Sequence, residues 1–102
     1  MLGERFGLDF DTFAASMMKE GFDQVVKRIW EPHTTVDEHT HPFDAKALLV
    51  QGEMWLTVDG RTEHLLPGGM FELPANLSHS ERYGSEGATY WVARRNLSGQ
   101  KR

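Results

Sequence analysis

Hydrophobic residues near the start of the chain repeat with the period of an α-helix. Between Asp9 and Gly21, five apolar positions follow the spacing i, i+3, i+4, i+7 and i+8, which places them on one helix face. They are Phe10, Phe13, Ala14, Met17 and Met18. Asp9 suits the N-cap, and Gly21 suits the position after the last turn. The pattern predicts one helix over about residues 9–20, with its apolar face packed on the domain or on a partner subunit.

From Gln24 onward the pattern becomes that of β-strands. Residues 24–31, QVVKRIWE, mix β-branched and aromatic residues with charges and stop before Pro32, which halts regular strand pairing. Further on, Asp59-Gly60 separates two strand-like runs, and this is the strongest short-range signal for a hairpin.

Turn signals recur along the rest of the chain. Pro67-Gly68-Gly69 marks one turn, residues 70–74 follow as a short strand, and Gly84–Gly87 marks a further loop. About eight short strands with turns every 8–12 residues predict an all-β sandwich or barrel. A chain of 102 residues fits one domain over residues 1–102, with the helix at about 9–20 and the barrel at about 24–95.

Composition and charge restrict the classes of partner. The chain is 39% hydrophobic and 25% charged, which is ordinary for a globular protein. A net charge of −4 disfavours nucleic-acid binding, which depends on a basic surface. Met1–Phe10 lacks the apolar region of a secretory signal, and no apolar run approaches the roughly 20 residues of a membrane helix. We therefore expect a cytoplasmic protein without nucleic-acid or membrane partners.

Histidines are the candidate metal ligands, because the chain has no cysteine and a metal would need nitrogen and oxygen donors. His39 and His41 are one residue apart, and such residues project from the same face of a strand. The alternative interpretation is a pair of surface histidines near a strand start. A third histidine, His79, follows a short strand and a turn opened by Pro74, and it favours a metal site.

The spacing of these histidines resembles the first motif of the cupin superfamily. In that motif a His-X-His pair is followed by a glutamate and then a glycine. Here His39 and His41 match, three residues separate His41 from Ala45, and six more lead to Gly52.

A second cupin motif is matched further along the chain. Gly68, Pro74 and His79 fall at its positions, and the interval between the motifs is similar to that of compact single-domain cupins. The resemblance spans about Trp30 to Trp91. It implies a cupin jelly roll, a double-stranded β-helix of about eight strands with one N-terminal helix outside it.

Four residues depart from the family pattern. His33 stands where the first motif begins with glycine, and Asn76 replaces a glycine, although asparagine tolerates a left-handed turn. Tyr83 replaces the terminal asparagine of the second motif. Ala45 replaces the glutamate that supplies the fourth protein ligand in the family.

The resemblance implies a three-histidine metal site made of His39, His41 and His79. Its divalent ion would be Fe, Zn, Ni or Mn, and without the glutamate it would be more open and more positively charged. Hydroxide or an anionic ligand would balance the charge. Cupins resembling the thiol dioxygenases also lack the glutamate.

Other polar residues near the motifs are less favoured as metal ligands. Asp44 should face away from it. Glu81 shares the face of His79 and is a candidate ligand or acceptor, although a solvated strand charge is the favoured interpretation. His64 is expected on the surface, and His33 is expected to be structural or exposed.

Aromatic and basic residues complete the list of candidates. The aromatics suit a sandwich core, and half of them could line a ligand pocket between the sheets. They are Phe43, Trp55, Phe71, Tyr83, Tyr90 and Trp91. Arg28, Arg82 and Arg94 are candidates to hold a substrate carboxylate, because arginine favours bidentate contacts.

The leading functional hypothesis is a small metal-binding cupin that acts on a small anionic molecule, with dioxygenase, isomerase and lyase as the candidate reaction types. The alternative is a non-catalytic module that binds or senses a small ligand. A third interpretation is a dimerisation scaffold. A homodimer is expected in each case, because the edge strands of a small sandwich need cover.

Overall fold

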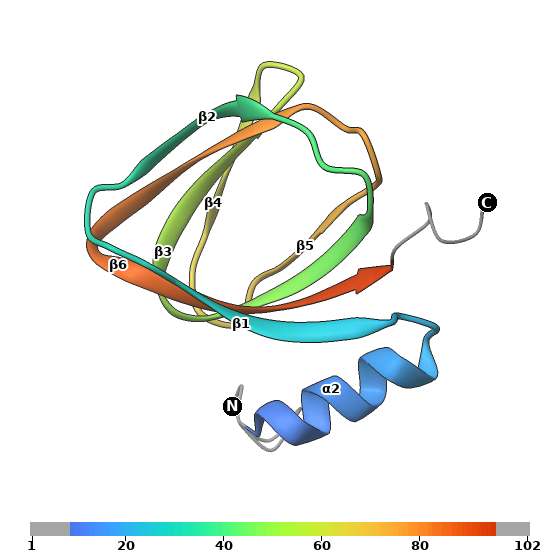
Figure 1. The fold of residues 1–102 in the computed structure, drawn as a ribbon. Coiled ribbons are helices and arrows are strands. Elements are labelled where there is room, and N and C mark those ends of the chain that lie inside the picture. The colour runs from blue at the N-terminus through green and yellow to red at the C-terminus, as the bar shows by residue number, and fades with distance from the viewer. Residues whose placement is uncertain (1–8, 96–102) are drawn as a thin grey trace.

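A computed structural model describes residues 9–95 of the chain, in which one helix lies beside a strongly curved antiparallel sheet (Figure 1). The elements are α2 (Phe10–Lys19), β1 (Gln24–Trp30), β2 (Thr35–His39), β3 (Asp44–Val58), β4 (Arg61–Leu65), β5 (Met70–Leu73) and β6 (His79–Arg95). Among these residues no helix has the length and hydrophobicity needed to cross a membrane. Most of Met1–Phe10, the segment in which we expect no secretory signal, lies outside the described residues. The boundaries of the single domain stay a prediction.

Two long strands organise the sheet. The main order is β1-β6-β3-β4, while β2 also pairs with β6 and β5 with β3. β3 has 15 residues and β6 has 17, so each runs through both halves of the sheet and pairs with different short strands in each half. The four short strands and the two halves of each long strand make eight strand segments. This is the predicted jelly roll.

A corner in the long strands separates the two halves. The β3–β6 register shifts between Leu49 and Gln51 and again between Gly52 and Met54. Core residues on β3 have odd numbers up to Leu49 and even numbers from Met54 onward. The irregularities therefore change which alternate residues face the interior, as bulges do.

The loop predicted at Gly84–Gly87 is wrong, because these residues lie inside β6. Gly87 has a φ of 66° and Gly52 has a φ of 82°. A Cβ at Gly52 would lie 2.1 Å from the Gly87 carbonyl oxygen, and a Cβ at Gly87 would lie 2.2 Å from the Trp30 carbonyl oxygen. The glycines thus permit a close approach of three strands at the corner rather than ending a strand.

The predicted hairpin and helix both form. Asp59 and Gly60 have φ values of 53° and 75°, as the tight turn between Val58 and Arg61 requires. At the helix, the Asp9 side chain accepts a hydrogen bond from the Asp11 amide at 2.9 Å.

Helix α2 packs on the outer face of the sheet beside β1 and β6 (Figure 1). Phe13 and Met17 are buried there, against Trp91 of β6. Met18 is 52% exposed, so the apolar face is narrower than the sequence pattern indicates.

Candidate metal centre

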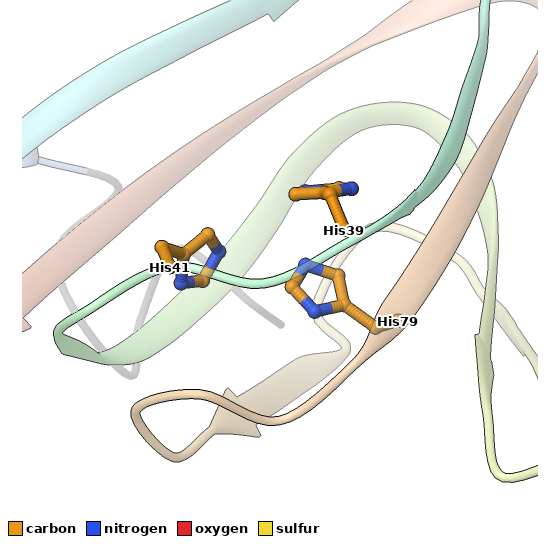
Figure 2. Close-up of side chains that lie close together, drawn as sticks. All are labelled: His39, His41 and His79. Carbon is orange, nitrogen blue, oxygen red and sulfur yellow. The ribbon is translucent and has the colours of Figure 1, made fainter.

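The pairing of β2 with β6 sets two of the three predicted ligands side by side. His39, the last residue of β2, is the cross-strand partner of His79, the first residue of β6. A register shift between Val36 and His39 turns His39 toward the interior. His41 follows in the connection to β3, and Figure 2 shows the three rings grouped together.

The three imidazoles form a compact cluster. The ring centroids of His39 and His79 are 4.3 Å apart, those of His41 and His79 are 4.8 Å apart, and those of His39 and His41 are 5.7 Å apart. One nitrogen from each ring lies within 4.8 Å of the other two. Nitrogens bound to one ion at about 2.1 Å lie roughly 3.0–3.5 Å apart, so a bound ion would draw the three nitrogens closer together.

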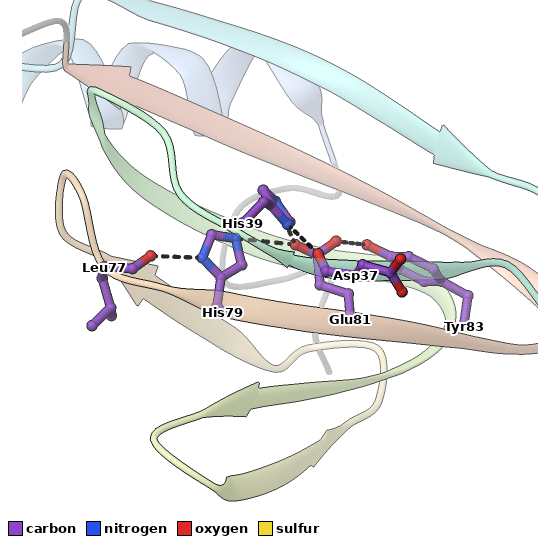
Figure 3. A network of polar contacts seen from close by, with 6 residues as sticks. All are labelled: Asp37, His39, Leu77, His79, Glu81 and Tyr83. Atoms are coloured by element: carbon purple, nitrogen blue, oxygen red, sulfur yellow. Dashed lines mark hydrogen bonds and ion pairs between the residues drawn. The ribbon is translucent and has the colours of Figure 1, made fainter.

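Backbone carbonyls fix the tautomers of two rings. Nδ1 of His39 donates to the Asp37 carbonyl at 2.8 Å, and Nδ1 of His79 donates to the Leu77 carbonyl at 3.0 Å (Figure 3). Because a carbonyl only accepts, the proton of each neutral ring is on Nδ1. The Nε2 lone pairs are then available to an ion, which is how ligating histidines are commonly oriented.

His41 is held differently, by stacking. Its ring lies parallel to Phe43, with centroids 4.4 Å apart. Burial lowers the pKa of His41, and the neighbouring His79 lowers it further. The imidazole therefore stays neutral to lower pH than an ordinary histidine, and a neutral ring is the form that binds metal.

Glu81 also points into the cluster, so its interpretation as a solvated strand charge is wrong. It follows His79 by two residues on β6, and its side chain is only 7% exposed. Its Oε2 lies 3.2 Å from Nε2 of His79 and 3.8 Å from Nε2 of His39. Its Oε1 accepts a hydrogen bond of 2.5 Å from the Tyr83 hydroxyl (Figure 3).

Tyr83 contacts Glu81 on the side away from the histidines. It is 1% exposed and stacks on Trp30 with centroids 5.1 Å apart and an angle of 11° between the rings. Burial raises the pKa of its hydroxyl, and the charge of Glu81 adds to the effect. The hydroxyl therefore stays protonated and remains a donor to Glu81.

A cavity of about 140 Å³ adjoins the cluster. Ala45 lines it together with His39 and His41, and the predicted position of the family glutamate therefore borders the site. The walls are mainly apolar and aromatic, as in small-molecule pockets. Residues of this kind in the lining are Trp30, Val36, Phe43, Phe71, Leu73, Tyr90 and Val92.

Two of the three candidate arginines reach this cavity. Arg28 and Arg94 line it from β1 and β6. The guanidinium of Arg94 lies over the Phe43 ring, 5.0 Å from the ring centroid. Arg82 instead lies over Trp55, 4.0 Å from its ring centroid, and borders a different hollow.

The remaining candidates lie outside the cluster. His64 is 44% exposed, and its Nε2 lies 2.7 Å from Oε2 of Glu53, so the surface prediction is confirmed. His33 is exposed, as predicted. Asp44 accepts a hydrogen bond from the Ala75 amide at 2.8 Å, which holds the loop before β6.

Two residues that replace motif glycines have the left-handed backbone conformation that glycine favours. His33 has a φ of 60° and Asn76 a φ of 67°, both in the left-handed region. The Asn76 amide also donates to the His41 carbonyl at 2.7 Å, which joins the loops bearing the two motifs. The alignment of both motifs therefore agrees with the backbone.

The donor set fits a divalent metal. Nδ1 of His41 and Nε2 of His79 are buried and have no hydrogen-bond partner in the described part of the chain. Such atoms are costly unless something satisfies them. Three imidazoles beside a carboxylate are ligands that suit zinc, iron or nickel.

Solved structures share this fold. An RmlC-like cupin from Shewanella frigidimarina has a TM-score of 0.62 at 22% identity, with 70% of this chain and 64% of that chain covered. KdgF from a Halomonas species has a TM-score of 0.61 at 18% identity, with 74% and 71% covered. A predicted oxalate decarboxylase from Thermotoga maritima has a TM-score of 0.63 at 15% identity, with 80% and 73% covered.

These likenesses establish the cupin fold, as the motifs predicted. The chain spans less than two thirds of the length of the Shewanella protein. No protein-family model matches the chain, and no curated protein matches it in sequence.

Proposed function

We propose that this chain is a metal-dependent cupin enzyme that binds a divalent ion through His39, His41 and His79 and acts on a small anionic molecule. The observation that supports this best is the convergence of the three imidazoles beside a cavity bordered by arginines. A bound ion would polarise a substrate oxygen or activate water.

The chain's own residues account for substrate binding. Arg28 and Arg94 line the cavity, and a guanidinium group suits a carboxylate. The cavity volume of about 140 Å³ suits a small molecule. The Thermotoga maritima relative is described as a predicted oxalate decarboxylase, and oxalate is a small dicarboxylate.

Metal binding is tested by thermal unfolding of chelator-treated protein with Zn²⁺, Mn²⁺, Ni²⁺ or, without oxygen, Fe²⁺. A free ion concentration 100 times the Kd stabilises the folded state by about 2.7 kcal/mol, which corresponds to several degrees. His39→Ala should remove most of this shift, and His64→Ala, the matched histidine control, should keep it. Equal shifts in the parent and in His39→Ala would contradict the proposed ligands.

Substrate binding is tested with the metal-loaded protein and a panel of small mono- and dicarboxylates, oxalate among them. Calorimetry should detect binding that Arg94→Gln weakens, and nuclear magnetic resonance should detect conversion of a bound compound. Lyase, isomerase and, with Fe²⁺ and oxygen, dioxygenase products are the ones to seek. Binding of carboxylates without turnover would instead favour the non-catalytic module.

A further inference from the structure

The carboxylate of Glu81 lies at the spacing of a metal ligand. Its Oε2 is 3.2 Å from Nε2 of His79 and 3.8 Å from Nε2 of His39. Donor atoms that share one divalent ion at about 2.1 Å lie roughly 3.0–3.5 Å apart. One of these two distances falls in that range, and the other is slightly longer.

The hydrogen bonds of the two histidines explain why a cation suits this position. Their Nδ1 protons are donated to backbone carbonyls, so in the neutral ring, which is the form that binds metal, the Nε2 lone pair is on the side of the carboxylate. Nε2 of His79 has no hydrogen-bond partner although Oε2 of Glu81 is only 3.2 Å away. Lone pairs that face one another repel, and a cation bound by both removes the repulsion.

Burial increases the need of the Glu81 carboxylate for a bound cation. The side chain of His79 is 0% exposed and that of Glu81 is 7% exposed. A carboxylate removed from water is costly unless it is paired with a cation or coordinates a metal. Within residues 9–95 the basic side chains that lie within 4 Å of this carboxylate are His39 and His79, which the proposed function assigns to the ion.

We propose that Glu81 is the fourth protein ligand of the ion, in place of the carboxylate that the cupin motif has at position 45. This inference rests on the proposed function. The ligand has moved from β3 to β6, where it shares a strand face with His79. Because Ala45 supplies no ligand, the side of the ion that faces the cavity is then open to a substrate.

Tyr83 is the positioning residue for this ligand. Its hydroxyl donates a hydrogen bond to Oε1 of Glu81, and the other oxygen, Oε2, then points toward the histidines (Figure 3). Its ring is fixed by the stack on Trp30. A partner that orients a ligating carboxylate typically contributes a factor of roughly 10–100 in metal affinity.

The test measures Zn²⁺ affinity by chelator competition and the visible absorption of bound Co²⁺, which reports the number and type of ligands. Glu81→Gln keeps the shape of the side chain and an acceptor for Tyr83. It should weaken Zn²⁺ binding more than Tyr83→Phe does and alter the Co²⁺ spectrum. Tyr83→Phe should weaken Zn²⁺ binding by roughly 10–100-fold and change the spectrum little.

A carboxylate that lies near the cluster on the exposed surface provides the matched control. Oε2 of Glu38 accepts a hydrogen bond from Ser78 at 2.5 Å, and Glu38→Gln should leave both measurements unchanged. The double variant Ala45→Glu/Glu81→Gln should recover affinity, because a carboxylate then returns from the β3 side. This rescue separates loss of a ligand from general damage to the fold.

The outcomes distinguish this inference from the function on which it rests. If the parent binds Zn²⁺ and Co²⁺ and Glu81→Gln has the same affinity and spectrum, Glu81 is not a ligand although the metal site stands. If the parent binds neither ion, the proposed function and this inference both fail. A selective loss in Glu81→Gln with rescue by the double variant supports the proposal.

Discussion

The two faces of the long strands β3 and β6 hold two clusters of opposite character. On the outer face, the helix cluster comprises Phe13, Met17, Phe22, Leu48, Trp91 and Ala93. On the inner face, alternate residues such as Ala47, Leu49 and Val92 belong to the inner cluster, which borders the cavity and the three histidines. Neighbouring residues along one strand therefore serve packing on one side and a polar site on the other.

The two clusters differ in whether they bury polar atoms without hydrogen-bond partners. The helix cluster is made of apolar side chains, and the rings of Phe10 and Phe13 lie 5.6 Å and 5.7 Å from that of Trp91. The inner side instead buries nitrogen atoms of His41 and His79 without hydrogen-bond partners. We infer that the outer face chiefly stabilises the fold, while the inner face gives up stability that a bound ion would restore.

The largest expected effect comes from breaking the helix cluster. Phe13 is 0% exposed, and Phe13→Ala should lower the free energy of unfolding by about 3–5 kcal/mol through lost burial and a cavity. Urea denaturation measures the change. Met18→Ala, at a position 52% exposed on the same helix, is the control and should change stability little. The Zn²⁺ affinity of the Phe13→Ala protein that remains folded should equal that of the parent, and a large change would show that the two faces are coupled.

A second expected effect appears on the inner face and depends on metal. Ala45 is 5% exposed beside the histidines, so Ala45→Glu in metal-free protein should lower the free energy of unfolding by roughly 1–3 kcal/mol or take up a proton. With Zn²⁺ bound, the added carboxylate can coordinate the ion, and the loss should disappear. Thermal unfolding with and without Zn²⁺ measures both states.

Ala47 provides the control for that comparison. It is 0% exposed and lies on the same face of β3, but it does not line the cavity. Ala47→Glu should destabilise the protein with or without metal. If Ala45→Glu behaves in the same way, position 45 does not face the ion and the alignment of the first motif is wrong.

The helix cluster was easier to predict from sequence than the inner site, because its signals are local. The spacing of Phe13 and Met17 and the cap at Asp9 depend on residues within a few positions of one another. The turn at Asp59-Gly60 is equally local.

Long-range pairing decides the features that sequence alone misjudged. Gly84–Gly87 has the composition of a loop, but Gly87 lies against Gly52 and Trp30, which are distant in the chain. Glu81 looks like a surface charge until the pairing of β2 with β6 encloses it beside His39. The parity of Glu81 with His79 was the available signal for its direction, but parity alone could not reveal burial.

The smallest expected effect concerns the histidine that lies outside both clusters. His64 stacks on Trp55 with centroids 4.6 Å apart and contacts Glu53, but its side chain is 44% exposed. Exposed polar contacts of this kind contribute about 1 kcal/mol or less, so His64→Ala should lower the free energy of unfolding by about that amount at most. Its Zn²⁺ affinity should equal that of the parent, because the residue shares no contact with the three-histidine cluster among residues 9–95. Urea denaturation and chelator competition on this one variant would measure both quantities. A marked fall in Zn²⁺ affinity would mean that His64 supplies a site of its own, and that the inner face does not account for all metal binding by this chain.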